Sequence, residues 1–300
     1  MTPCVDQRLL ASAVIVALAL SACAASQAPE VAAPADAAPT PAEEEALPAA
    51  DPHLVALEAA ALHAVRSEEN RARDPFRNPV ETLAFFGVRP DATVVEISPG
   101  GGWYAEILAP LLHAEGTYIA ASFNPEGPED AYFTQVGRQF VALLASNPVF
   151  ERVQRTLFAP PDQLDFGPEA SADVVLTFRN LHGWQRRGSL DAILAAAHRA
   201  LKPGGVLGVV QHRAAEGSAW EETIESGYLP EAWVIARIEA AGFRLDARSE
   251  INANPRDTRD HPSGVWTLPP TLRLGDQDRE RYLEIGESDR MTLRFVKVER

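Results

Sequence analysis

Short apolar runs alternate with helical stretches along most of this chain, and few folds accommodate that order. The runs are apolar throughout, which is typical of strands in a parallel sheet covered on both faces. They lie at residues 93–97, 117–121, 153–158, 173–177 and 206–210. Helical periodicity between them covers residues 104–113, 132–145 and 189–201, the last stopped by a Lys-Pro-Gly-Gly turn at 202–205. The alternation predicts a doubly wound, mostly parallel α/β sheet.

Further elements are expected on either side of this core. Two helices, at residues 53–73 and 79–86, precede the first strand and form an N-terminal helical extension. After a helix at 230–241, strands at 243–250 and 291–298 complete a seven-stranded sheet with an edge hairpin. We therefore expect one α/β domain over residues 53–300.

The N-terminus has the features of an export signal. Arg8 precedes an apolar run at residues 9–20, which is shorter than the roughly 20 residues of a spanning helix. The run ends in Leu-Ser-Ala-Cys at residues 20–23, which resembles the lipobox of bacterial lipoproteins. By that resemblance residues 1–22 are a signal peptide and Cys23 becomes the lipid-modified first residue of the mature chain. An ordinary secretory signal and a membrane anchor are the alternatives.

Residues 23–52 are rich in Ala, Pro and Glu, contain no Lys or Arg, and cannot build a core. We interpret them as a semi-extended tether. The whole chain has 27 Lys and Arg against 42 Asp and Glu, a net charge of -15 that opposes nucleic-acid binding. Its two cysteines, Cys4 and Cys23, precede the domain, which therefore contains no disulfide, thiolate zinc site or cysteine nucleophile.

A glycine-rich turn at residues 98–102 connects the first strand to a helix. Glycines let the backbone approach a ligand, and a helix N-terminus offers unpaired N–H donors. The turn predicts a nucleotide-type pocket, with a plain tight βα turn as the alternative. Valine at Gly100 or Gly102 is expected to fill ligand space and leave the fold intact.

Two cofactor classes use such a turn. The spacing of Gly100 and Gly102 fits the dinucleotide fingerprint, but that fingerprint expects an acid roughly 20 residues later, and residues 120–124 contain none. The other class needs an acid at the end of the first strand, which Glu96 supplies, and a Lys-Pro-Gly-Gly turn before a late strand. On these motifs the chain resembles class I S-adenosylmethionine-dependent methyltransferases, which have a Rossmann-like sheet.

A narrower resemblance rests on residues 71–79, 81–87, 98–104 and 176–182. These stretches are similar to a family of predicted bacterial methyltransferases, several of them exported, and the likeness covers most of residues 64–298. It implies that S-adenosyl-L-methionine lies across the carboxyl ends of the first, second and fourth strands. The implied cofactor-binding residues are Glu96, Ser98, Pro99, Gly100, Gly102, Tyr104, Ser122, Asn124 and Phe158.

The resemblance gives each part of the cofactor its place. The methionyl part would lie on the glycine turn with Glu96 toward its ammonium, the adenosine near Ser122 and Asn124, and its ring near Phe158. Two departures stand out. Ser98 replaces the first glycine of the pattern, and no acid follows the second strand, where Asn124 offers hydrogen bonds without charge.

Arg179, Asn180 and His182 follow the fourth strand, where this fold places groups that face the methyl acceptor. His182 is a candidate base with a reference pKa of about 6.5, and His212 is a weaker one. The alternative is that Asn180 and His182 only satisfy backbone groups. Tyr104 and Trp184 are candidates for a cation–π wall or for simple packing.

Three arginines, Arg71, Arg73 and Arg77, precede the first strand in an otherwise acidic protein. Arginine suits bidentate capture of a carboxylate or phosphate, so the group could hold the cofactor's carboxylate or an anionic acceptor. The simpler interpretation is ion pairing with nearby Glu68, Glu69 and Asp74. The loop at 254–260 is long enough for a lid. The seven histidines show no metal-ligand spacing.

The leading hypothesis is a methyltransferase for a small molecule, lipid-anchored at the periplasmic face of the bacterial outer or inner membrane, with no nucleic-acid partner. Ala24 after the cysteine favours the outer membrane. A non-catalytic periplasmic binding lipoprotein on the same fold is the first alternative. A nicotinamide-dependent oxidoreductase using NADP is the second.

Overall fold

An eight-stranded sheet organises residues 51–299, the part of the chain that the computed structural model describes. Its order is β4-β3-β2-β1-β5-β6-β8-β7. The strands are β1 (Thr93–Ile97), β2 (Thr117–Ser122), β3 (Gln154–Ala159), β4 (Gln163–Leu164), β5 (Ala172–Phe178), β6 (Leu201–His212), β7 (Phe243–Ser249) and β8 (Arg290–Lys297).

Strand β1 lies at the centre, where the order of strands reverses. It pairs in parallel with β2 on one side and β5 on the other, so that Glu96 lies opposite Ala120 and Leu176. β8 is antiparallel and lies between β6 and β7. The doubly wound fold and the edge hairpin are confirmed. The expected count of seven strands is wrong by one, because the two-residue β4 adds an antiparallel pair at the β3 edge.

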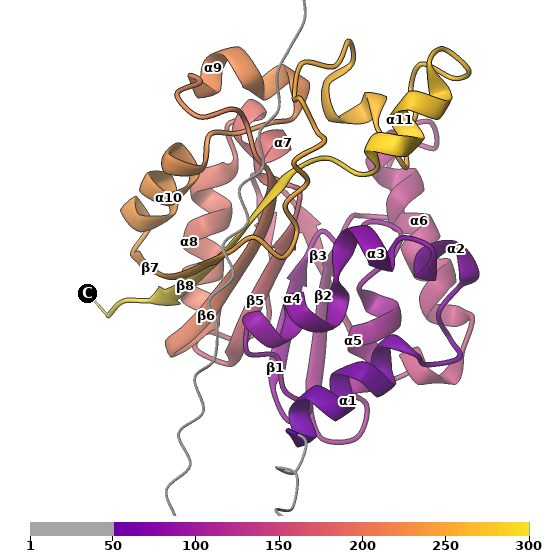
Figure 1. Cartoon of the computed structure of the whole chain (residues 1–300). Coiled ribbons are helices and arrows are strands. Elements are labelled where there is room, and N and C mark those ends of the chain that lie inside the picture. The colour runs from indigo at the N-terminus through magenta and orange to yellow at the C-terminus, as the bar shows by residue number, and fades with distance from the viewer. Residues whose placement is uncertain (1–50, 300) are drawn as a thin grey trace, which may run out of the picture. The chain divides into compact units, whose positions relative to one another are not determined.

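Helices cover both faces of the sheet (Figure 1). Val94 and Val95 show the division, since the first belongs to the core beneath α1, α4, α5 and α6 and the second to the core beneath α7, α8 and α10. The α-helices are α1 (Pro52–Ala61), α2 (Glu68–Arg71), α3 (Asp74–Arg77), α4 (Pro79–Phe85), α5 (Ala105–Leu112), α6 (Tyr132–Ala145), α7 (Leu181–Arg186), α8 (Leu190–Ala200), α9 (Trp220–Thr223), α10 (Glu231–Ala240) and α11 (Arg279–Ile285).

Two expected boundaries are wrong. The helix expected at 53–73 ends at Ala61, and α2 begins after Ser67, whose side chain accepts a hydrogen bond from Asn70 N at 3.2 Å. A serine in this N-cap position starts a new helix. The Lys-Pro-Gly-Gly stretch lies within β6. Leu201, just before this stretch, already pairs with Ala172 of β5, and the stretch itself forms a bulge before the pairing resumes at Val206.

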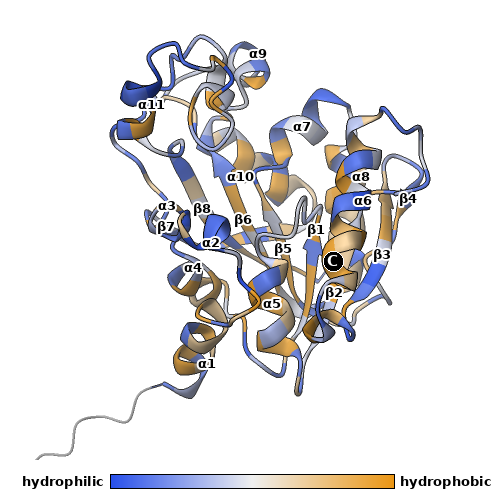
Figure 2. Cartoon of the chain, turned by 90° about the vertical axis from the view of Figure 1, so that its right-hand side faces the viewer, coloured by the Kyte–Doolittle hydropathy of each residue, from blue (hydrophilic) through white to orange (hydrophobic). Residues whose placement is uncertain are grey.

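Long connections gather at the carboxyl ends of the parallel strands, near α7, α9 and α11 (Figure 1). The loops around α11 are mostly hydrophilic, whereas the helix faces turned to the sheet are mostly hydrophobic (Figure 2). Within residues 51–299 no helix has the length and apolar character needed to cross a membrane. The predicted signal peptide, Cys23 and nearly all of the tether lie outside the described residues.

Candidate functional site

The glycine loop between β1 and α5 contains three residues in the left-handed backbone region. The φ angle is 62° at Ser98, 61° at Gly100 and 90° at Gly102. Glycine adopts this region freely, whereas serine does so rarely. Ser98 N donates to Ala121 O at 2.9 Å, and Gly102 N donates to Pro99 O at 3.0 Å. Ser98 thus holds a conformation suited to glycine, and the loop is fastened to the end of β2.

The two glycines differ in what surrounds their missing side chains. A Cβ on Gly100 would meet no heavy atom within 4 Å. A Cβ on Gly102 would lie 2.1 Å from Leu143 Cδ2 and 3.5 Å from the ring of Phe140, both on α6. The expectation that valine would fill ligand space at either position is therefore wrong for Gly102. Of these two glycines, Gly100 is the one that borders open space.

Glu96 lies beneath the loop and is 2% exposed. Tyr118 Oη donates a hydrogen bond to Glu96 Oε2 at 2.5 Å. Burial raises the pKa of Glu96 to about 7, although the hydrogen bond from Tyr118 and the charge of Arg179 act in the opposite direction. Tyr118 therefore occupies one carboxylate oxygen of Glu96, whereas the other, Oε1, has no hydrogen-bond partner among residues 51–299.

The residues expected around the adenosine lie at the ends of β2 and β3. Ser122 is buried, and its Oγ accepts a hydrogen bond from Arg155 Nη1 at 3.4 Å. Asn124 is exposed, and its Oδ1 caps its own turn by accepting from the N–H of residue 126 at 3.0 Å. Phe158 is 1% exposed, with the ring of Phe123 5.6 Å and that of Trp184 5.8 Å away. Phe158 is therefore a core residue covered by other rings.

Aromatic residues flanking the loop are packed rather than open. Tyr104 is 5% exposed and stacks on Phe178 with ring centroids 3.6 Å apart. Burial raises the pKa of Tyr104 to about 12. Trp184 is also buried, and the guanidinium groups of Arg66 and Arg77 lie 5.0 and 4.7 Å from the ring centre of Trp103. The packing alternative for Tyr104 and Trp184 matches these contacts.

Asn180 joins the ends of β1 and β5. Its Nδ2 donates to Ile97 O and to Thr177 Oγ1, both at 3.2 Å. The preceding residue, Arg179, has φ 65°, an uncommon value for a residue with a side chain. Residues held in such conformations cluster at functional sites, and Ser98 and Arg179 are on neighbouring strand ends. The amide of Asn180 thus fixes the spacing between these two strained residues.

His182 accepts a hydrogen bond at Nδ1 from Gln211 Nε2, at 3.3 Å. Gln211 Nε2 also donates to Gly227 O at 3.1 Å, which sets the orientation of the amide. Burial lowers the pKa of His182 to about 4, so the ring is neutral at pH 7. A neutral ring that accepts at Nδ1 carries its proton on Nε2. In this arrangement His182 donates from Nε2, and service as a base needs the other tautomer.

His212 lies beside His182, with ring centroids 5.7 Å apart. His212 Nδ1 and Ser288 Oγ share a hydrogen bond at 2.5 Å, and burial lowers the pKa of His212 well below its usual value. When Nδ1 carries the proton toward Ser288, Nε2 is a free acceptor. Gln211 and Ser288 are site residues that the sequence analysis missed, since a lone glutamine in a strand and a serine before one carry no motif.

The three N-terminal arginines separate in the structure. Arg71 Nη2 donates to His63 O at 3.1 Å, away from the other two. Arg73 Nη2 and Arg77 Nε lie 2.8 and 3.1 Å from oxygens of Glu287, just before β8. The expectation of pairing with Glu68, Glu69 and Asp74 is wrong, because Arg71 has no acidic partner among residues 51–299, and Arg73 and Arg77 pair with Glu287. Their partner is more than 200 residues away and was not predicted.

The loop at 254–260 is held in place by buried hydrogen bonds and is not a free lid. Asp257 is 1% exposed, lies 2.8 Å from His261 Nε2, and accepts from Tyr228 Oη at 2.9 Å. Asn254 N donates to Asp289 Oδ1 at 2.8 Å. These buried bonds hold the loop against the start of β8.

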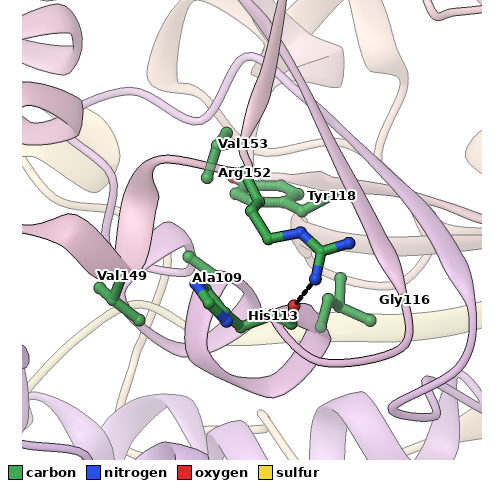
Figure 3. A pocket seen from close by; sticks show the side chains of 8 residues that line it. Ala109, His113, Gly116, Tyr118, Val149, Arg152 and Val153 are labelled. Carbon is green, nitrogen blue, oxygen red and sulfur yellow. Dashed lines mark hydrogen bonds between the residues drawn. The ribbon is translucent and has the colours of Figure 1, made fainter.

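A separate pocket lies between the end of α5 and the start of β2 (Figure 3), and it shares with the site only Tyr118, the hydrogen-bond partner of Glu96. Its lining includes Ala109, Tyr118 and Val153, and the Arg152 guanidinium donates to the carbonyl of His113 at the end of α5. Within residues 51–299 no group of three or more His, Cys, Asp or Glu side chains is arranged to hold a metal ion.

Comparison with solved structures places this fold. A proposed sarcosine dimethylglycine methyltransferase from Galdieria sulphuraria has a TM-score of 0.50 at 13% identity, covering 77% of this chain and 85% of its own. The [4+2]-cyclase SpnF has a TM-score of 0.51 at 14% identity, with coverage of 82% and 93%. A SAM dependent methyltransferase from Aquifex aeolicus has a TM-score of 0.48 at 15% identity, with coverage of 76% and 93%. No family model and no curated protein matches the sequence.

The chain therefore has the Rossmann-like fold of class I S-adenosylmethionine-dependent methyltransferases. At these identities the likeness extends to the fold alone. The presence of a cyclase among the neighbours illustrates that the reaction must be argued from the site.

Proposed function

We propose that the protein is an S-adenosyl-L-methionine-dependent methyltransferase acting on a small-molecule acceptor. The observation that carries the proposal is the left-handed loop at Ser98 and Gly100, placed where the strand order reverses, with open space beside Gly100. Open α/β sheets bind ligands in the crevice at this point.

The residues present fit the cofactor. Ser98, Pro99, Gly100 and Gly102 would support its methionyl part through the backbone, and Glu96 Oε1 would receive its ammonium. Other residues near the same strand ends would support the cofactor. Tyr104 packs beneath the loop, and Ser122 and Asn124 offer polar groups toward the ribose. Phe158 supports the ring of Phe123, which covers it.

The cofactor supplies a methyl group activated by a sulfonium. Transfer of that methyl group would be an in-line displacement, which would require this chain's residues to align the acceptor and, where its nucleophilic atom carries a proton, to accept that proton. Asn180 fixes the strand ends, Arg179 faces the acceptor, and His182 orients it by donation from Nε2. Where the acceptor atom carries a proton, the imidazole of His212 is the base.

The strand arrangement argues against the nicotinamide alternative. Dinucleotide-binding domains have the parallel order 3-2-1-4-5-6. Here β8 is antiparallel and separates β6 from β7. The chain also lacks the acid that the ribose of a dinucleotide requires.

Calorimetry on the full-length protein with S-adenosylmethionine and S-adenosylhomocysteine tests the proposal. We expect both to bind, and no binding by either at millimolar concentration would rule it out. Gly100→Val should abolish binding. Gly204→Val is the matched control. Gly204 also has a positive φ, of 72°, and no atom within 4 Å of its Cβ direction, but it lies at the amino end of β6, away from the carboxyl ends where the glycine loop lies.

We further propose that the protein is exported and anchored by lipid at Cys23, at the periplasmic face of the outer membrane. The lipobox-like residues 20–23, Ala24 and the tether support this location. Palmitate labelling in the native host should mark the parent and not Cys23→Ser. An unlabelled cytosolic parent that keeps Met1 would overturn the location and leave the enzymatic proposal untouched.

A further inference from the structure

Resting on the proposed methyltransferase function, we infer that the acceptor is an anion, bearing a carboxylate or a phosphate, and that Arg179 captures it. The inference comes from a cluster of four arginines, Arg73, Arg77, Arg179 and Arg290, which we call the arginine cluster. It lies at the carboxyl end of β5, beside the glycine loop.

The arginine cluster has too few negative charges. All four guanidinium groups lie within 4 Å of a single carboxylate, Glu287: the nitrogen-to-oxygen distances are 2.8, 3.1, 3.8 and 3.1 Å for Arg73, Arg77, Arg179 and Arg290. The other nearby acid is Glu96, whose pKa of about 7 leaves it partly protonated at neutral pH. Even with both acids ionised the cluster keeps two excess positive charges.

Three of the four arginines have unused hydrogen-bond donors, because Arg73 Nη2 is also buried without a hydrogen-bond partner among residues 51–299. Arg77 is 3% exposed, and its Nη2 is buried without a partner among residues 51–299. Within the same residues the guanidinium of Arg179 makes no hydrogen bond, its only ionic contact being the one to Glu287 at 3.8 Å. Burial lowers the pKa of Arg179 to about 10, so it is charged at neutral pH. The unpaired buried donor of Arg77 is costly unless a ligand satisfies it, and the Arg179 side chain, which is 27% exposed, can reach such a ligand.

By contrast, each guanidinium nitrogen of Arg290 has a hydrogen-bond partner. It donates from Nε to Ser288 O at 3.1 Å, from Nη1 to Glu287 and from Nη2 to the carbonyl of Phe76. Arg290, Arg73 and Arg77 thus hold Glu287 in place, and the guanidinium of Arg179, together with Arg77 Nη2, remains for a ligand. A guanidinium binds a carboxylate or phosphate through two parallel hydrogen bonds.

The cofactor cannot neutralise the cluster by itself. Its carboxylate carries one negative charge, but its ammonium and sulfonium each carry a positive one, so its net charge is +1. Binding the cofactor raises the excess positive charge near the glycine loop. A second, anionic ligand is needed, and Arg179 is three residues before His182, where an acceptor would lie.

The test uses inorganic phosphate as the probe, titrated calorimetrically into the full-length protein, with S-adenosylhomocysteine titrated separately. Arg179→Gln should weaken phosphate binding at least ten-fold, and Arg179→Lys should weaken it less because it keeps the charge. The matched control is Arg186→Gln, which removes the same charge from the exposed face of α7, where Arg186 pairs with Glu225 at 3.3 Å. Binding of S-adenosylhomocysteine should be unchanged in all three variants. Acetate titrated in parallel shows which anionic group binds more tightly.

Three results would overturn the inference. The first is a parent protein that binds neither anion, and the second is equal loss in Arg179→Gln and Arg186→Gln. The third is a loss of S-adenosylhomocysteine binding in Arg179→Gln with phosphate binding intact, which would assign Arg179 to the cofactor's carboxylate. If phosphate binding depends on Arg179 while S-adenosylhomocysteine fails to bind the parent, the anion site stands and the methyltransferase proposal fails.

Discussion

The two halves of the sheet present different kinds of residues at the carboxyl ends of their parallel strands. The half formed by β1, β2 and β3, which we call the glycine-loop half, consists of left-handed backbone, stacked rings and apolar side chains. The half formed by β5, β6 and β8, which we call the arginine half, brings together guanidinium, carboxylate and imidazole groups from distant parts of the chain. The first half is suited to holding a ligand by shape, and the second by charge.

One buried carboxylate on each side makes the contrast measurable. Burial raises the pKa of Glu96 to about 7, because its hydrogen bond from Tyr118 does not compensate for lost water. Burial acts on Glu287 in the same direction, but the charges of Arg77, Arg290, Arg179 and Arg73 together outweigh it and lower the pKa to about 2. Neighbouring charge, not depth, decides which acid is ionised.

The largest expected effect comes from removing the carboxylate of the arginine half. Glu287→Gln leaves four guanidinium groups without a counterion, and breaking a buried pair in this way costs about 3–5 kcal/mol. Urea denaturation at pH 7 measures the loss. The folded-state pKa of Glu287 is depressed, so its contribution is present above about pH 4.5 and is lost as the pH falls toward 2.

The matched control is Glu225→Gln, which removes an exposed acid paired with a single arginine, Arg186. We expect a change within about 0.5 kcal/mol. Equal stability losses in the two variants would contradict the view that Glu287 holds the arginine half together.

The acid of the glycine-loop half should behave in the opposite way with pH. Below pH 4.5 the Glu96 carboxyl is neutral in both states. As the pH rises to 7 the unfolded chain loses its proton first, so stability falls by about 3 kcal/mol and then levels off. Glu96→Gln removes this loss. The stability of the variant minus that of the parent should therefore be greater at pH 8 than at pH 4.

Two further variants sharpen this measurement. Tyr118→Phe removes the hydrogen bond that lowers the pKa of Glu96, so the midpoint of the stability loss should move upward. Glu58→Gln changes an exposed acid on α1 and should leave the pH profile of stability as it is in the parent. A Glu96→Gln profile parallel to the parent's would show that folding does not shift the pKa of Glu96.

The sequence predicts the glycine-loop half far better than the arginine half. Strands β1, β2 and β3 and helix α6 follow from local periodicity, which each segment carries within itself. The glycine turn is equally local. Its residues are contiguous, so Ser98, Gly100 and Glu96 could be placed before the fold was known.

The arginine half depends on contacts that no local pattern encodes. Arg77 meets Glu287 across 210 residues, and His212 meets Ser288 across 76. A run such as Glu-Ser-Asp-Arg at 287–290 has the composition of an exposed loop, yet all four residues are less than 5% exposed. The loop at 254–260 was misinterpreted for the same reason, because its buried bonds to Tyr228 and Asp289 are formed only in the fold.

A smaller effect should separate the two glycines of the loop. Gly102→Ala places a methyl group against Leu143 and needs φ 90°, so we expect a loss of roughly 2–3 kcal/mol in stability. Gly100→Ala meets open space and should lose about 1–2 kcal/mol from its φ alone. Thermal and urea unfolding of the two variants measure the difference. Equal losses would indicate that α6 does not pack against the loop.

The smallest effect concerns the missing acid in the glycine-loop half. Asn124 follows β2, is exposed, and caps its own turn with Oδ1, a bond that a carboxylate oxygen can make equally well. Asn124→Asp should therefore keep the fold and add a second acceptor oxygen for ribose hydroxyls, because an ionised carboxyl accepts where the amide nitrogen only donates. We expect S-adenosylhomocysteine to bind a few-fold more tightly to Asn124→Asp, which is about 1 kcal/mol. Asn147→Asp is the control, since Asn147 caps its turn in the same way, by accepting from Val149 N at 3.0 Å, away from the glycine loop. Calorimetry on the two variants separates the effect of where the acid lies from the effect of adding one negative charge. Equal affinities would mean that shape and backbone alone hold the ribose in this half of the sheet, leaving charge to the arginine half.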